Sequence, residues 1–211
     1  MDYITVRGQA TAEVVIKKSR FLGRVFPVSD EAQAQACLEG VRAEHRNARH
    51  HAFAYRLGPA ALVQRMSDDG EPQGTAGRPI LKLLQKQGVT DVLVVVTRYF
   101  GGILLGAPGL VRAYGEAARS ALAAAGHERR RELTVVRLTL DYTWLGQVQH
   151  WLSEAGALTV STDFTDRVML TAAINSELAD RLVRSLVDRT SGQLKAETAG
   201  TQFVAEPISA R

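Results

Sequence analysis

The pattern of apolar and polar positions near the N-terminus predicts two strands followed by a helix. The segments AEVVIKK (12–18) and FLGRVFPV (21–28) alternate or run apolar, which is typical of strands joined by a tight polar turn, here at Lys18–Arg20. Ser29 is expected to cap a helix over residues 30–45, whose first turn carries acidic side chains. The first 45 residues are therefore expected to form a hairpin and one amphipathic helix.

The middle of the chain predicts a second hairpin, two helices and a buried strand. HHAFAYRL (50–57) alternates and ALVQRM (61–66) returns after a Gly-Pro turn, while RPILKLLQKQG (78–88) has a helical period and ends in glycine. DVLVVVT (91–97) is continuously apolar and rich in β-branched residues, as expected of a central strand covered on both faces. A longer helix is predicted over residues 110–125 and is ended by a glycine.

The pattern changes once more after an arginine row in HERRREL (127–133), which is expected to be a linker. The remaining segments predict strand, helix, strand, strand, helix and strand, which is the order of a ferredoxin-like βαββαβ domain. A chain of 211 residues has room for one larger and one smaller domain. We therefore expect an α+β protein with an N-terminal domain at residues 1–131 and a ferredoxin-like domain at residues 132–211.

Charge separates the two predicted domains. Residues 1–131 carry 19 Lys and Arg against 12 Asp and Glu, whereas residues 132–211 carry 7 against 10. A basic N-terminal part favours a polyanionic partner, and RNA is favoured over a membrane because no basic amphipathic helix is evident. No apolar run reaches the roughly 20 residues of a membrane span and no signal peptide is recognised, so the sequence predicts a cytoplasmic protein. The single cysteine, Cys37, has helical spacing to apolar residues and is expected to be a buried structural thiol.

The first candidate for chemistry is the loop RYFGGILLGAPG (98–109), which connects the buried strand to a helix. Arg98 with Tyr99 and Phe100 is suited to grip phosphates and stack on bases. Glycines at a helix start let backbone N–H groups approach an anion, although the spacing matches neither the Walker A motif nor the dinucleotide fingerprint. The alternative is that the aromatic residues only cover the core. In that reading the glycines, including Gly101, Gly102 and Gly106, only permit tight packing.

The second candidate is the loop SDDGEPQGT (67–75). Its acids, together with the nearby histidines, suggest a metal or acid–base site, but their spacing fits no recognised ligand set. We therefore favour an acidic surface loop with Asx-type turns. His50 and His51 point to opposite faces of a strand, so at most one of them is expected to reach a given site. The candidate loop residues are Asp68, Asp69, Glu71, Gly74 and Thr75, and Arg78 follows them at a helix start.

Four strings of residues, in this order and spacing, resemble the IMPACT family, in particular its bacterial YigZ-type members. They are KKSRF, HHAFAYRLG, SDDGEPQGTAGRPIL and VVVTRYFGGILLGAPGLVRAYGEAA, and the resemblance covers about residues 3–125. It implies that residues 1–128 are similar to the second domain of ribosomal protein uS-five, a mostly antiparallel sheet covered by helices on one face. The same fold occurs in domain four of elongation factor G, whose domain five is similar to the predicted ferredoxin-like domain. The pairing implies contact with RNA or the ribosome, and the eukaryotic relatives are translation regulators.

Three functions are compatible with these features. The leading hypothesis is a non-enzymatic RNA- or ribosome-associated regulator of translation, which binds through the RYFGG loop together with the GEPQGTAGRP loop. One alternative is a small-molecule enzyme or a phosphate or nucleotide binder that uses the Gly-rich helix start and an aspartate of the acidic loop. The other is an adaptor that docks a protein on the acidic C-terminal domain. No catalytic residue, metal or cofactor is predicted, and the expected contact residues are Arg20, His50, Arg78, Arg98, Tyr99, Phe100, Gly101, Gly102, Gly106 and Arg112.

Overall fold

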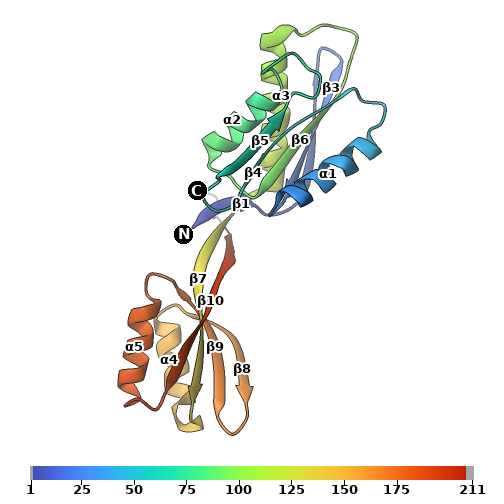
Figure 1. The fold of residues 1–211 in the computed structure, drawn as a ribbon. Helices are drawn as coiled ribbons and strands as arrows, with labels where there is room; N and C mark the ends of the chain where they lie inside the picture. The colour runs from blue at the N-terminus through green and yellow to red at the C-terminus, as the bar shows by residue number, and fades with distance from the viewer. Residues whose placement is uncertain (1, 208–211) are drawn as a thin grey trace. The chain divides into compact units, whose positions relative to one another are not determined.

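The computed structural model describes residues 2–207 and confirms the α+β class (Figure 1). The chain divides into two compact units, Asp2–Arg129 and Arg130–Ala205, which are described separately. No helix in the described part of the chain is long and apolar enough to cross a bilayer.

The N-terminal unit is built on a five-stranded sheet with the strand order β2-β3-β6-β4-β5, in which all neighbouring strands are antiparallel. The central position therefore belongs to β6, the strand that the sequence predicts to be the most apolar. The elements of this unit are β1 (Tyr3–Val6), β2 (Ala10–Ile16), β3 (Ser19–Pro27), α1 (Glu31–Glu44), β4 (His50–Leu57), β5 (Val63–Ser67), α2 (Gly77–Gln87), β6 (Val92–Tyr99) and α3 (Gly106–Ala125).

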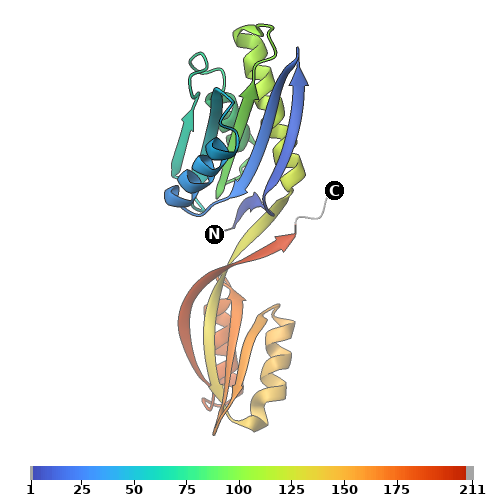
Figure 2. The same cartoon turned by 90° about the vertical axis from the view of Figure 1, so that its right-hand side faces the viewer.

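Helices cover both faces of this sheet, which corrects the expectation of helices on one face. Val92, Val94 and Val96 of β6 belong to the core beneath α2 and α3, whereas Leu93 and Val95 belong to a second core beneath α1. Figure 2 shows α1 on the side of the sheet opposite α2 and α3. The physical reason is that every position from 92 to 96 is apolar, so both faces of the strand must be removed from water.

Two local features differ from expectation by one residue. The turn between β2 and β3 is formed by Lys17 and Lys18, both in the left-handed region with φ of 46° and 64°, because Ser19 already pairs with Ile16. Two left-handed residues are the requirement of the tight hairpin turn that matches the twist of the strands. Helix α1 is capped by Asp30, whose carboxylate accepts the Gln33 N–H at 2.8 Å.

The C-terminal unit has the expected ferredoxin-like order. Its strands run β10-β7-β9-β8 across the sheet. Apolar residues of β7 and β9 pack against α4 and α5 in a core that includes Leu138, Leu170, Leu152 and Leu186. The segment 127–133, expected to be a linker, is instead the first half of a strand. The elements are β7 (His127–Leu140), a 3-10 turn (Tyr142–Trp144), α4 (Leu145–Glu154), β8 (Leu158–Phe164), β9 (Val168–Asn175), α5 (Ala179–Arg189) and β10 (Lys195–Pro207).

Candidate functional site

The candidate site lies where β6 ends and the Gly-rich loop begins. In the sheet register Arg98 of β6 is the cross-strand partner of both Phe21 of β3 and His50 of β4, while Tyr99 is the partner of Arg20. Directly opposed residues of antiparallel strands share a face of the sheet. Antiparallel pairing therefore brings together residues that the sequence places in three separate motifs.

Arg98 is held by contacts on several sides and is only 7% exposed. Its Nη1 donates to Oε1 of Glu71 at 2.7 Å, and the hydroxyl of Tyr114 on α3 donates to the same oxygen at 2.7 Å. The guanidinium also lies over the rings of Phe21 and Phe100, at 5.5 and 5.4 Å from the ring centres. The two predicted loops thus meet through a buried ion pair, and the charge of Arg98 is already balanced within the protein.

The carboxylate of Asp68 organises the second loop by accepting three backbone N–H groups. Oδ1 accepts those of Ala76 and Gly77, each at 2.9 Å, and Oδ2 accepts that of Gly74 at 2.8 Å. These bonds satisfy N–H groups at the start of α2, which otherwise lack partners. Burial by itself raises the pKa of this carboxyl, but the three N–H groups outweigh it and hold the pKa below its ordinary value.

The neighbouring acids are also committed to the protein. Asp69 accepts the backbone N–H of His51 with Oδ2 at 2.6 Å and the Nη2 of Arg42 with Oδ1 at 3.1 Å. Glu71 and Thr75 are buried, so the loop is only partly the surface loop that we expected. Across residues 2–207 no three His, Cys, Asp or Glu side chains are grouped so that they could hold a metal ion. Both oxygens of each aspartate thus already accept hydrogen bonds within the protein, and these bonds order the loop.

Asp68→Ala is expected to lower the free energy of unfolding by about 1–3 kcal/mol at pH 7, because buried N–H groups lose their acceptor. The pKa of Asp68 in the folded protein lies below its ordinary value of 3.8, so its stabilising effect is complete above that value. The effect is lost as the pH falls through the lower folded pKa. Urea unfolding of both proteins from pH 7 downwards measures this: the difference between them should shrink at acidic pH, and a constant difference contradicts the assignment.

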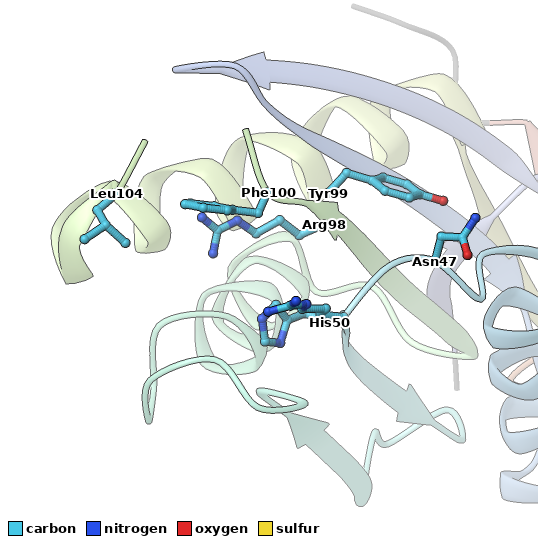
Figure 3. Close-up of a pocket in the computed structure, with 7 residues that line it drawn as sticks. Asn47, His50, Arg98, Tyr99, Phe100 and Leu104 are labelled. Carbon is cyan, nitrogen blue, oxygen red and sulfur yellow. The ribbon is translucent and has the colours of Figure 1, made fainter. Parts of the chain in front are cut away.

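A cavity of about 630 Å³ opens beside Arg98, and we call it the strand-end pocket (Figure 3). Four of the expected contact residues line it, namely His50, Arg98, Tyr99 and Phe100. The other three lining residues, which the sequence analysis did not name, are Asn47, Arg49 and Leu104. Asn47 and Arg49 lie in the basic segment between α1 and β4, and the charge of that segment was the signal that could have identified them.

The two histidines separate as expected. His50 lines the pocket, and its Nδ1 lies 2.9 Å from the backbone oxygen of Asp69. A carbonyl oxygen can only accept, so Nδ1 carries the proton and Nε2 of the neutral ring is left as an acceptor. His51 is buried away from the pocket lining with its Nδ1 3.1 Å from the Thr97 hydroxyl, and burial lowers its pKa.

The aromatic residues of the loop have different environments. The hydroxyl of Tyr99 hydrogen-bonds Nδ1 of His45 at the end of α1, at 2.9 Å, so this ring is tied to the α1 side. Phe100 is 56% exposed, and Leu104 is 82% exposed. More than half of Phe100 therefore lies outside the core, and the loop presents apolar surface beside the pocket.

The remaining expected residues lie outside the pocket lining. Arg20 lies over the Tyr99 ring at 5.6 Å and pairs with Glu13 at 2.7 Å. Arg78 and Arg112 are exposed. Gly102 and Gly106 adopt φ of 84° and 70°, which favour glycine. Gly101 instead packs directly against the turn between β2 and β3. Gly74 and Thr75 belong to the loop whose N–H groups bond Asp68.

These features define a two-domain α+β protein whose N-terminal sheet ends in a cationic and aromatic pocket. The sequence-family model of the Impact N-terminal domain matches residues 17–122. The family model of a domain of unknown function, DUF1949, matches residues 138–193. The IMPACT family member YvyE of Bacillus subtilis is 37% identical over 192 residues, which cover 91% of this chain and 88% of YvyE. The IMPACT family member YigZ of Escherichia coli is 38% identical over 182 residues, 85% of this chain and 89% of YigZ.

A solved structure described as that of a hypothetical protein covers 92% of this chain and 96% of its own, with a TM-score of 0.63 and 36% identity. The eukaryotic Protein IMPACT of Danio rerio is 34% identical over 123 residues, which cover 56% of this chain and 38% of that protein. The chain belongs to the IMPACT family.

Proposed function

We propose that this protein is a non-enzymatic, RNA- or ribosome-associated regulator of translation that binds RNA at the strand-end pocket. The observation that supports this most is the presence of an exposed arginine and an exposed aromatic ring in the same pocket. Arg49 lines the pocket, is exposed and has no ion-pair partner among residues 2–207, and Phe100 lines the same pocket. Unpaired cations bind phosphates and aromatic rings stack on bases, so this combination suits RNA.

The surroundings of the pocket strengthen the proposal. Lys17 and Lys18 form an exposed hairpin turn, and the backbone of that turn packs against Gly101 in the pocket's loop. The basic excess of residues 1–131 thus includes cations close to the pocket's loop. Arg98 is not a phosphate ligand in this proposal, because Glu71 already balances its charge. Membership of a family whose eukaryotic members are translation regulators agrees with this proposal.

Arg49→Ala is expected to weaken binding to RNA and to ribosomes several-fold, because one phosphate contact is lost. The slope of log K against log salt concentration should fall in magnitude by about 1. Gel shifts and ribosome cosedimentation between about 50 and 200 mM salt measure both quantities. Arg181→Ala, an equal charge change at an exposed position of α5, is the matched control and should leave both unchanged.

Several outcomes are decisive for this proposal. If the wild type binds neither RNA nor ribosomes at low salt, the proposal is wrong. A shift in unfolding midpoint with free nucleotides and no RNA binding would favour the small-molecule alternative instead. Ribosome binding that is insensitive to salt and to Arg49→Ala would favour the adaptor alternative, in which the acidic C-terminal unit docks a protein.

A further inference from the structure

We infer that the strand-end pocket takes one unpaired nucleobase, which stacks on Phe100 while its phosphate meets Arg49. This inference rests on the proposed RNA-binding function and specifies the form of RNA that is recognised. The preferred ligand is then single-stranded or looped RNA, because the bases of a duplex are stacked inside it and cannot enter a pocket. The cavity of about 630 Å³ is within the roughly 300–1,000 Å³ of small-molecule sites.

Phe100 already presents an exposed ring in the absence of a ligand. Figure 3 shows the guanidinium of Arg98 against one side of the ring. The guanidinium carbon lies 5.4 Å from the ring centre, and more than half of the residue remains exposed. Arg98 itself cannot move freely, because Phe21 lies at 5.5 Å and Glu71 bonds it at 2.7 Å. A ring that is supported on one side loses less conformational entropy when a base stacks on the other side than an unsupported ring does.

The structure separates the roles of the two arginines. Arg98 is buried and paired, so its contribution is to support the Phe100 ring from beneath. Arg49 is exposed and has no ion-pair partner in the part of the chain that the structure describes, so its guanidinium is available to a phosphate. In this proposal Arg98 supports the ring on which the base stacks, and Arg49 binds the phosphate.

Polar groups in the pocket can contact the edge of a base. Nδ1 of His50 donates to the Asp69 carbonyl, which leaves Nε2 as an acceptor suited to the amino group of adenine, cytosine or guanine. The amide of Asn47 offers both a donor and acceptors. Leu104 adds an exposed apolar wall beside Phe100. A stacking ring, a hydrogen-bonding edge and a free cation together match the parts of a nucleotide.

The experiment measures the affinity of the full chain for two labelled RNAs of equal length, one single-stranded and one fully paired, by fluorescence anisotropy at fixed salt. The wild type should bind the single strand at least about tenfold more tightly. Phe100→Leu, which keeps an apolar side chain but removes the ring, should weaken single-strand binding about tenfold and leave duplex binding unchanged. Phe164→Leu, the same change at an exposed phenylalanine of β8, should leave both affinities unchanged.

A second variant tests contact with the base directly. Phe100→Trp should retain the affinity for the single strand, and its added fluorescence should be quenched by that RNA more than by the duplex. Equal affinity for the two RNAs, or wild-type affinity of Phe100→Leu for the single strand, would overturn the nucleobase pocket while leaving RNA binding intact. Absence of binding to any RNA or ribosome is the different result that overturns the proposed function.

Discussion

Glu71→Ala should be the most damaging single side-chain truncation at this site, lowering the free energy of unfolding by about 3–5 kcal/mol. The substitution leaves the guanidinium of Arg98 buried without its counter-charge and removes the acceptor of the Tyr114 hydroxyl. Desolvated charges are costly when unpaired, so the loss should exceed that of an ordinary hydrogen bond. Urea unfolding followed by circular dichroism measures the change.

The unfolding experiment on Glu71→Ala has controls within the same chain. Glu116→Ala breaks the exposed pair with Arg119, at 3.1 Å, and should cost no more than about 1 kcal/mol. Both tryptophans, Trp144 and Trp151, lie in the C-terminal unit, so their fluorescence follows that unit while circular dichroism follows both. The effect of Glu71→Ala should therefore be larger by circular dichroism than by tryptophan fluorescence. A loss below about 1 kcal/mol would show that Arg98 does not depend on Glu71.

This buried pair determines which variants can test binding. Removing Arg98 would unbalance Glu71 and release the Phe100 ring, so a loss of RNA affinity in that variant would report on folding as well as on contact. Arg49 and Phe100 are exposed and make none of the hydrogen bonds that join Arg98, Glu71 and Tyr114, so their substitution is expected to leave those bonds in place. Arg98 was among the contact residues expected from the sequence; because Arg98 is buried and paired, Arg49 and Phe100 are the better positions at which to test binding.

Most of the fold was predictable because its signals are local and periodic. The apolar run 92–96 predicts a strand covered on both faces, and the structure confirms this with separate cores on the two sides. The same run conflicts with the expectation of helices on one face, which came from the family resemblance. The hydrophobic pattern therefore predicted the covering of the sheet better than the resemblance did. The βαββαβ order of the C-terminal unit was likewise visible in periodicity alone.

The site was less predictable because its contacts join residues that only the tertiary structure brings together. Asp68 accepts N–H groups six to nine residues further along the chain, and Glu71 meets Arg98 and Tyr114 from two other elements. No period or spacing encodes such partners, so the acids were indistinguishable from a solvated surface loop. Arg49 was missed because an isolated arginine before a strand forms no sequence pattern; only the fold brings it into the same pocket as Phe100.

One glycine connects the stability of the N-terminal unit to the proposed binding site. A Cβ added to Gly101 would lie 2.0 Å from the carbonyl carbon of Lys18 and 2.3 Å from the nitrogen of Ser19. Both are backbone atoms, so no change of rotamer relieves the clash. The turn cannot simply move away, because Lys17 and Lys18 are already in the left-handed conformation that the hairpin requires. The N–H of Gly101 also donates to the Ser19 hydroxyl at 3.1 Å.

Gly101→Ala is therefore expected to lower the free energy of unfolding by about 3 kcal/mol or more, at the upper end for overpacking. Gly102→Ala separates this clash from backbone strain: it has open space and φ of 84°, and should cost only about 1–2 kcal/mol. Gly40→Ala, in open space on helix α1, should be neutral or stabilising. Urea unfolding ranks the stabilities of the three variants.

Because Phe100 precedes Gly101, the affinity for single-stranded RNA should fall in Gly101→Ala and stay near that of the wild type in Gly40→Ala. If Gly101→Ala is as stable as Gly40→Ala, the loop does not rest on the hairpin, and the hairpin has no part in positioning the stacking ring.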